Sequence, residues 1–285
     1  MPVPSDLNEQ VGRALAEDIG QGDLTASLIP ADRNGRASVI TREPAIICGV
    51  PYVEAVFHAV EPRVRIDWRV AEGDAARADQ LLFTVEGPAR ALLTAERTAL
   101  NFLQMLSATA TAAHEFAVLL EGTNCRLLDT RKTIPGLRTA QKYAVRVGGG
   151  QNHRMGLFDG ILIKENHIMA AGSIGAAVAA ALASAQRAGG QVRVEVEVED
   201  LEQLRQAIDA RADIALLDNF SLAAMREAVA VNAAAHRPLE LEASGGITAS
   251  TIRGIAGTGV DFISVGAITK HVRAIDLSMR FEFQT

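Results

Sequence analysis

Three of the four lysines in this 285-residue chain lie close together, at Lys132, Lys142 and Lys164. Arginine supplies all the other basic side chains, so lysine is rare enough for its placement to be informative. The window 126–167 contains eight cationic and three acidic side chains, a net charge of +5, whereas the whole chain carries −6 and the remainder therefore −11. A cationic cluster in an acidic protein indicates a site for a small anionic ligand.

Polar or glycine-rich sequence also marks the ends of six strands expected in the second part of the chain. These strands are predicted at 126–129, 158–164, 192–198, 214–217, 239–243 and 261–265. Helical patterns alternate with the later strands, which predicts parallel strands with right-handed crossovers. Six units favour a small or incomplete barrel, and an open doubly wound sheet is the alternative. In either fold the carboxyl ends of the strands meet on one face, so distant residues are expected to share a pocket.

The segment 194–199 alternates valine with glutamate. On a barrel strand the valines would face the outer helices, and Glu195 and Glu197 would face the interior. Buried carboxylates need cations or hydrogen-bond donors, and the cationic cluster contains the obvious partners. An exposed strand with one wet face is the alternative explanation.

Glycine turns follow the last two predicted strands. Ser244, Gly245 and Gly246 precede a helix expected to start near Thr248, and Gly266 follows the next strand. Glycines let backbone N–H groups approach a phosphate, and a helix N-terminus adds positive potential. This arrangement matches the usual phosphate site of barrel enzymes, although a plain tight turn is also compatible with each sequence. The glycines at 148–150 are neither a dinucleotide fingerprint nor a P-loop, and are interpreted as a flexible turn delivering the residues that follow.

Other charged residues are first interpreted as surface features. Arg138, Lys142 and Arg146 are four apart, which predicts a solvated stripe on one helix. Glu96 and Arg97 lie on a predicted long helix and would make an ordinary surface pair.

The first 120 residues mix helices and strands. A capped helix is predicted at 5–17, strands at 35–41, 64–70 and 81–85, and a long helix at 89–120 whose leucines recur at helical spacing. This style differs from the later strand–helix alternation and indicates a separate structural region.

Composition excludes several classes of protein. A net charge of −6 argues against general nucleic-acid binding, and the chain has no uninterrupted apolar run of 18 residues that would predict a membrane span. The first residues lack a charged-then-apolar signal pattern, and Cys48 and Cys125 form neither a disulfide framework nor a metal spacing. A cytoplasmic location is therefore expected.

The residues alone thus describe a phosphosugar enzyme with a second, anionic substrate. Cations suit the carboxylates or phosphates, and the glycine turns suit a phosphate. Asp218 and either Glu195 or Glu197 suit ribose hydroxyls, or a Mg²⁺ ion carried in by phosphates.

Five longer motifs resemble the quinolinate phosphoribosyltransferase family. They are the segments 129–138, 142–146, 148–154, 216–220 and 242–247, and the resemblance extends from 17–25 to 266–269. Ile134 and Val147 stand where threonine and cysteine are expected, and neither change removes a charged group.

The resemblance implies an α/β fold with an N-terminal α/β sandwich domain over 1–110 and an incomplete, six-stranded TIM-like barrel over 111–270. A C-terminal segment, 271–285, is expected to return to the N-terminal domain. The resemblance also implies a homodimer in which Arg97 reaches into the partner's active site, which replaces the surface-pair interpretation of Arg97.

The implied reaction is a pentosyl transfer in de novo NAD biosynthesis. Quinolinate and phosphoribosyl pyrophosphate react with Mg²⁺ present, giving nicotinate mononucleotide, pyrophosphate and CO₂. Lys132, Glu197 and Asp218 would be catalytic, the two acids holding the ribose hydroxyls and stabilising positive charge on the sugar. The metal ligands are not assigned, and Mg²⁺ is expected to arrive mainly with pyrophosphate, with Glu197 and Asp218 as candidate ligands. By resemblance, quinolinate would be bound by Arg131, Lys132, His153, Arg154, Lys164 and the partner's Arg97, and the 5′-phosphate by Ser244, Gly245, Gly246 and Gly266.

Two alternatives remain at this point. One is a paralogous phosphoribosyl or pyrophosphorylase-type enzyme of the same fold, linked to molybdenum uptake. The other is a non-catalytic sensor of an anionic metabolite. The paired acids Glu197 and Asp218 argue against the sensor, because a pure anion binder gains nothing from nearby carboxylates.

Overall fold

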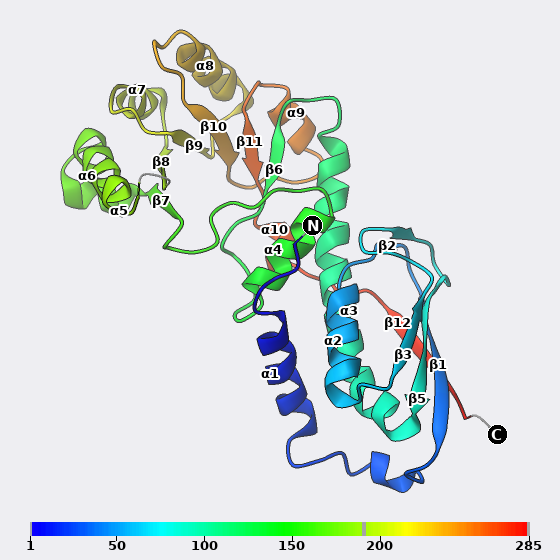
Figure 1. Ribbon diagram of the computed structural model, residues 1–285. Coiled ribbons are helices and arrows are strands. Elements are labelled where there is room, and N and C mark those ends of the chain that lie inside the picture. The colour runs from blue at the N-terminus through cyan, green and yellow to red at the C-terminus, as the bar shows by residue number, and fades with distance from the viewer. Residues whose placement is uncertain (1, 190–191, 284–285) are drawn as a thin grey trace. The chain divides into compact units, whose positions relative to one another are not determined.

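The computed structural model describes residues 2–189 and 192–283, which divide into two compact units (Figure 1). Unit 1 comprises Met1–His114, Thr133–Gly149 and Ala267–Thr285, and unit 2 comprises Glu115–Lys132 and Gly150–Gly266. The two units are therefore interleaved along the chain, whereas the predicted domains were consecutive. Segment 133–149, which the prediction gave to the barrel, belongs to unit 1.

Unit 1 is built on a four-stranded antiparallel sheet. Its strand order is β12-β1-β5-β3, with β1 at Asn34–Thr41, β3 at Arg65–Trp68, β5 at Leu81–Pro88 and β12 at Leu277–Phe283. Strands were expected at the positions of β1, β3 and β5, and the structure confirms them. The last strand, β12, pairs with β1 along its whole length, from Leu277 opposite Thr41 to Phe283 opposite Gly35.

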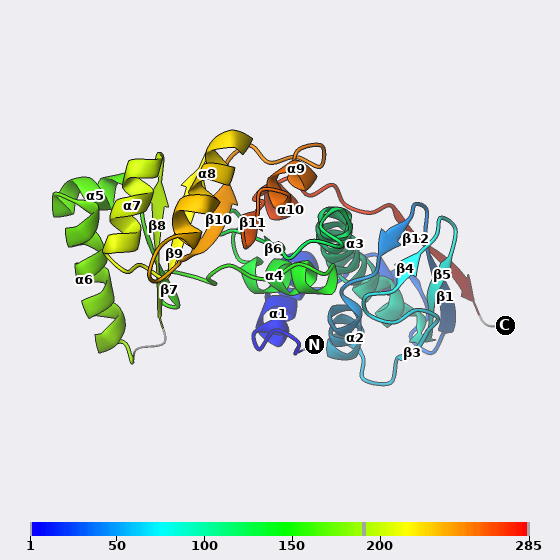
Figure 2. The same ribbon diagram turned by 90° about the horizontal axis from the view of Figure 1, so that it is seen from above.

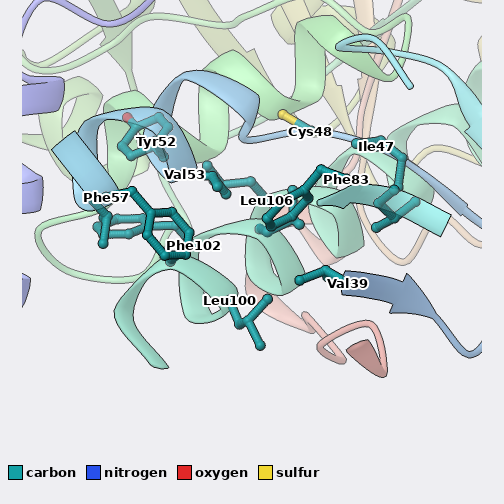
Figure 3. Close-up of a cluster of buried hydrophobic side chains, with 14 of the residues drawn as sticks. Val39, Ile47, Cys48, Tyr52, Val53, Phe57, Phe83, Leu100, Phe102 and Leu106 are labelled. Carbon is teal, nitrogen blue, oxygen red and sulfur yellow. The ribbon is translucent and has the colours of Figure 1, made fainter. Parts of the chain in front are cut away.

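Helices cover this sheet and enclose an apolar core. The main ones are α1 (Leu7–Ile19), α2 (Val50–Val60), α3 (Ala89–Leu119) and α4 (Arg138–Val147), and the short α10 spans Ala267–Lys270. Two two-residue strands, β2 (Ala45–Ile46) and β4 (Ala75–Ala76), and a short 3-10 helix, Ala26–Leu28, complete the unit. Figure 3 shows the centre of the core, where Tyr52 and Phe57 of α2 lie among Phe83 of β5 and Phe102 of α3. Four of the five leucines that predicted α3 are buried in this core, namely Leu92, Leu100, Leu103 and Leu106, and Leu93 is half-buried.

Unit 2 is built on a six-stranded parallel sheet of order β6-β11-β10-β9-β8-β7. Strands β6 and β7 are its two edges, so within the described residues the sheet does not close on itself. Figures 1 and 2 show helices α6 to α9 along one face of the strands. This is the incomplete α/β barrel that was predicted. The strands are β6 (Arg126–Leu128), β7 (Gly160–Ile163), β8 (Arg193–Val198), β9 (Ile214–Asp218), β10 (Glu240–Ser244) and β11 (Phe262–Ser264), and the helices are α5 (Glu165–Ala171), α6 (Ile174–Arg187), α7 (Leu201–Asp209), α8 (Leu222–Ala233) and α9 (Ile252–Ala256).

Side-chain caps set the ends of the barrel helices. Ser221 was predicted to cap α8, and its hydroxyl oxygen accepts the N–H of Ala224 at 3.2 Å. Asn232 near the end of α8 then bonds both backbone groups of Leu239, at 2.8 and 2.9 Å, which fixes the entry to β10.

Two predicted boundaries were wrong. The helix after β10 begins at Ile252 rather than near Thr248, because the N–H of Thr248 donates to the hydroxyl of Thr251 in a turn. Strand β7 begins at Gly160 rather than at 158, because the carboxylate of Asp159 accepts the N–H groups of Met155 and Gly156 at 2.7 and 2.8 Å.

No single helix in the described part of the chain is long and apolar enough to cross a membrane. Helices α5 and α6 have enough length and apolar composition to span a membrane only when they are taken together, and a 96° bend separates them.

Candidate active site

Strand β8 separates its valines from its glutamates as the sequence predicted. Val194, Val196 and Val198 are 0% exposed, on the face that packs against α6 and α7. Glu195 is 3% exposed, and Glu197 is also largely covered, with 13% of its side chain accessible. The inner face of the sheet therefore contains carboxylates. The alternative of a strand with one solvent-exposed face is wrong.

Lys164 is the cation that meets Glu197. The register pairs Ile163 with Val196, so the first residue after β7 lies beside Glu197. The ammonium group of Lys164 donates to Glu197 Oε2. Because 45% of the Lys164 side chain is exposed, it can bind a ligand while anchored to the strand beside it.

A histidine, not a lysine or arginine, meets Glu195. His153 Nε2 lies 2.8 Å from Glu195 Oε2 and 3.6 Å from Glu242 Oε2. The fully buried carboxylate of Asp129, directly after β6, accepts the N–H of His153 at 2.9 Å and the side-chain amide of Asn152 at 2.6 Å. The expectation that the lysines and arginines would neutralise both interior glutamates is thus correct for Glu197 and wrong for Glu195.

Arg154 and Arg131 place two like charges near each other. Arg154 Nη1 donates to the carbonyl of Gly160 at 3.0 Å, which fixes the guanidinium at the start of β7. Burial lowers the pKa of Arg154, and the charge of Arg131 lowers it further, while Glu195 opposes the shift. A pair of guanidinium groups that repel each other is stabilised by a shared anionic ligand.

Gly266 makes room for Lys132. A Cβ atom at position 266 would lie 2.9 Å from Lys132 Cδ and 3.3 Å from the hydroxyl of Thr130. That same hydroxyl accepts the N–H of Lys132 at 3.1 Å. The glycine predicted for a phosphate cradle therefore also allows the Lys132 side chain to pass.

Asp218 and Ser244 lie opposite each other at the carboxyl ends of β9 and β10. Asn219 links them, because its side-chain amide donates to Asp218 Oδ2 at 2.9 Å and its N–H donates to the Ser244 carbonyl at 3.0 Å. A Cβ atom at Gly245 would lie 2.1 Å from Asn219 Oδ1, and φ at Gly245 is +98°, so only glycine fits there. The turn continues through Gly246, where φ is +57°.

Two interpretations of unit 1 residues need correction. Lys142 is only 1% exposed, so the stripe on α4 is not solvated, and Arg138 and Arg146 are half-buried. Gly148 is a packing residue rather than part of a flexible turn, since a Cβ atom there would lie 2.2 Å from the carbonyl oxygen of Ala110.

Arg97 is exposed on α3 in unit 1. Burial raises the pKa of its neighbour Glu96, and the charge of Arg97 opposes that rise. The other predicted site residues all belong to unit 2.

Unit 1 also has a pocket of about 470 Å³ between α1, α3 and the loop 135–137. Gln10, Asp18 and Phe102 are among the residues that line it. The described lining contains none of the predicted site residues, so the pocket is not assigned to the predicted active site.

Glu242 is the interior residue that sequence reasoning missed. It is 0% exposed, and burial raises its pKa well above the ordinary range, with the charge of Glu195 adding to the effect. The sequence did contain a pattern that predicts an interior glutamate here, because residues 240–243 alternate glutamate with an apolar residue as β8 does.

Two sets of residues could hold a cation. Glu197 and Asp218, on the neighbouring strands β8 and β9, offer the one or two carboxylates with which proteins bind Mg²⁺ beside a substrate phosphate. A second set is His153, Glu195 and Glu242, whose ligand atoms lie within 4.8 Å of one another.

An α/β barrel with cations, acids and a glycine turn at the carboxyl ends of its strands defines a class of enzymes that act on anionic, phosphorylated substrates. Two family models match the chain: the C-terminal domain of quinolinate phosphoribosyl transferase over residues 109–280, and its N-terminal domain over 23–107. The chain belongs to the quinolinate phosphoribosyl transferase family.

Curated relatives agree with this assignment. The chain is 40% identical over 273 residues to a probable nicotinate-nucleotide pyrophosphorylase [carboxylating] of Bacillus subtilis, covering 96% of this chain and 92% of the relative. It is 41% identical over 275 residues to the nicotinate-nucleotide pyrophosphorylase [carboxylating] of Mycobacterium leprae, covering 95% of each. The solved structure of the nicotinate-nucleotide pyrophosphorylase from Francisella tularensis superposes with a TM-score of 0.91 at 48% identity, covering 99% of this chain and 98% of that one.

Proposed function

We propose that this protein is a nicotinate-nucleotide pyrophosphorylase (carboxylating). It transfers the phosphoribosyl group of phosphoribosyl pyrophosphate to quinolinate with loss of CO₂, in de novo NAD biosynthesis. The observation that carries the proposal is membership of the family over residues 23–107 and 109–280, together with cations and acids at the ends of six parallel strands. Both of the earlier alternatives predict other outcomes in the assay below.

The cationic side chains are proposed to bind quinolinate. Its two adjacent carboxylates repel each other and need several fixed positive charges. Arg131 and Arg154 can each grip a carboxylate with two hydrogen bonds, and Lys132 and Lys164 act as compact charges. The repulsion between Arg131 and Arg154 in the free protein supports this role, because a bound dianion would relieve it.

The acids are proposed to act on the sugar. As the pyridine nitrogen of quinolinate attacks the anomeric carbon and pyrophosphate leaves, positive charge develops on the ribose. Glu197 and Asp218 would hold the ribose hydroxyls and stabilise that charge. The backbone of Gly245 and Gly246, with Ser244 and Gly266, would hold the 5′-phosphate.

Decarboxylation then follows from the first step. Alkylation leaves the ring nitrogen positively charged, and this charge stabilises the carbanion left at C2 when the 2-carboxylate departs as CO₂. A proton from Lys132 or from water completes the product, nicotinate mononucleotide. The protein contributes orientation and electrostatics to this sequence.

Magnesium is proposed to enter with pyrophosphate. Glu197 and Asp218 would hold it, and the ion would neutralise charge on the leaving group. The carboxylate donors and their position on adjacent strands fit such an ion.

A homodimer is proposed, with Arg97 serving the partner's site. The exposure of Arg97 on α3 supports this role. A cytoplasmic location is proposed with it, in keeping with two buried cysteines that are not joined in a disulfide.

The test of the function is direct. Purified protein with quinolinate, phosphoribosyl pyrophosphate and Mg²⁺ should release nicotinate mononucleotide and CO₂ in equal amounts. Folded protein that yields neither product would overturn the proposal, and nucleotide formation from a different acceptor would favour the paralogous enzyme. Ligand binding without any turnover would favour the sensor.

The dimer has its own test. Arg97→Ala and Lys132→Ala should each lose activity, because each removes a different part of the same composite site. Mixing the two variants should restore about a quarter of wild-type activity, since half of the dimers then contain one intact site. If mixing restores nothing while subunits are shown to exchange, Arg97 does not act across the interface.

A further inference from the structure

Asn219 is one of three non-glycine residues in the described part of the chain whose backbone is left-handed. Its φ is +57°, and Asp79 and Arg211 have φ values of +60° and +61°. A left-handed backbone costs most side chains free energy, whereas glycine adopts it without that cost. Asparagine tolerates it better than most residues, but glycine would fit this backbone at least as well. The side chain at position 219 is therefore expected to make contacts that matter.

The backbone of Asn219 joins the ends of two neighbouring strands. Asn219 directly follows Asp218, the last residue of β9, and the register places Asp218 opposite Ser244 at the end of β10. The N–H of Asn219 donates to the Ser244 carbonyl at 3.0 Å. The bonding between β9 and β10 thus extends one residue beyond the last strand pair, on a left-handed backbone.

The side chain of Asn219 lies between an acid and a glycine. Its amide nitrogen, Nδ2, donates to Asp218 Oδ2 at 2.9 Å. Its oxygen, Oδ1, lies against the backbone of Gly245, where a Cβ atom would come within 2.1 Å of Oδ1 and 2.7 Å of Cγ. Gly245 therefore forms one wall beside the amide and limits the directions in which the amide can point.

The carboxylate of Asp218 depends on this amide for its orientation. Asp218 is half-buried, and among the residues that the structure describes no second donor holds its carboxylate. An aspartate side chain without such a bond can occupy several rotamers. The bond from Asn219 to Oδ2 fixes the plane of the carboxylate, and the position of Oδ1 is fixed with it.

We propose that Asn219 is a positioning residue for a 5-phosphorylated ribose: it holds Asp218 at a set distance and direction from the glycine turn 244–246. This inference rests on the proposed function, which assigns Asp218 to the ribose and the turn to its phosphate. The hydroxyls and the phosphate of one sugar have a defined separation, so the two groups that bind them need one as well. Asn219 supplies it through its bonds to Asp218 and Ser244 and its contact with Gly245. It acts through these residues and does not touch substrate.

Two substitutions at position 219 separate the hydrogen bond from the backbone. Asn219→Asp keeps the shape and the tolerance for a left-handed backbone, but it replaces the donor with a carboxylate that repels Asp218. Asn219→Gly removes the amide and leaves a backbone that suits a φ of +57°. Arg211→Gly is the matched control, because it makes the same change at a φ of +61°, on an exposed side chain that precedes β9. Thermal unfolding shows which variants are folded, and either variant at position 219 is sufficient for the test.

The kinetic expectation is selective for one substrate. Asn219→Asp and Asn219→Gly should each raise KM for phosphoribosyl pyrophosphate about tenfold, the size of a lost hydrogen bond to a charged group. KM for quinolinate should stay within about twofold of wild type, and Arg211→Gly should leave both KM values within that range. Equal rises in both KM values, or unchanged KM values in folded Asn219 variants, would overturn the positioning role.

Binding of ribose 5-phosphate gives a measurement without turnover. Calorimetry should show its affinity about tenfold weaker in Asn219→Asp than in wild type, whereas inorganic phosphate, which lacks the ribose, should bind both proteins within about twofold. Equal losses for the two ligands, or wild-type protein that does not bind ribose 5-phosphate, would overturn the inference. If no nicotinate mononucleotide forms but the difference in ribose 5-phosphate affinity remains, the proposed function fails and the positioning role stands. If nicotinate mononucleotide forms and the affinities are equal, the positioning role alone fails.

Discussion

The two units differ in what they bury. The centre of unit 1 is hydrocarbon, contributed by the sheet, α2 and α3 (Figure 3). Among its described residues, Lys142 is the one buried charged side chain, whereas unit 2 buries Asp129, Glu195 and Glu242 at the inner side of its strands. An apolar core stabilises the fold wherever it is, but buried carboxylates require specific partners and therefore specific geometry. Changes in the apolar core of unit 1 should thus alter stability, and changes at the strand ends of unit 2 should alter chemistry.

The largest effect on stability is expected from Phe57→Ala. Phe57 is 1% exposed on α2, and truncating a buried phenylalanine typically costs about 3–5 kcal/mol of unfolding free energy. Activity per folded molecule should change little. Denaturant unfolding and active-site titration measure the two quantities, with the exposed Arg63→Ala as a control. A stable variant with lost activity would break the contrast between the units.

The largest effect on chemistry is expected from Lys132→Ala. Removing a positioned charge from such a site typically lowers the rate by about 10²–10³-fold. The thermal unfolding temperature should hardly change, because Lys132 is exposed. Steady-state kinetics measure the rate, and calorimetry measures the unfolding temperature. As a control, Lys270→Ala changes another exposed lysine and should alter neither quantity. A large loss of stability with intact activity would make Lys132 a structural residue.

Gly245→Ala should affect both stability and chemistry, because the glycine turn belongs to the fold and to the site. The new methyl group would meet Asn219 in a backbone conformation that costs a non-glycine residue about 1–3 kcal/mol. KM for phosphoribosyl pyrophosphate should rise more than KM for quinolinate. Unchanged KM values for both substrates would separate this turn from phosphate binding.

The most gradual effect is a pH dependence of stability. The pKa of Glu242 is raised in the folded protein. At pH values between the unfolded and the folded pKa, the folded state therefore binds one more proton than the unfolded state. The free energy of unfolding consequently falls as pH rises through this range. Glu242→Gln should remove this loss, which is at most about 1.4 kcal/mol per pH unit. Urea unfolding of both proteins between pH 5 and pH 8 measures the gap, which should widen with pH. A gap of constant size would mean that Glu242 is ionised in the folded state.

Periodicity was sufficient to predict most of the fold. The alternation of β8 and the leucine spacing of α3 appear in the structure as expected, and Ser221 caps α8. Helix α2 was missed although Pro51 falls in its first turn, a position typical of helix starts. Strand β12 was missed as an element although the segment was expected to return to the first domain.

The site was predictable by residue type but not by partner. Charges at strand ends could be identified from the chain, because parallel strands bring their carboxyl ends together. Which carboxylate meets which cation depends on register, and register places Lys164 beside Glu197 while His153 meets Glu195. The burial of Lys142 could not be predicted from the sequence either, since cations spaced by four residues on a helix are usually solvated.

The pairing of β1 with β12 has a consequence for synthesis of the protein. Arg42, just after β1, bonds to Ser278, which lies 236 positions later in the chain. At translation rates of roughly 5–20 residues per second, β1 leaves the ribosome on the order of tens of seconds before its outer neighbour. During that interval one edge of β1 exposes unpaired backbone groups, which are a template for aggregation. The four-stranded sheet of unit 1 can therefore be completed only after the intervening barrel has been synthesised.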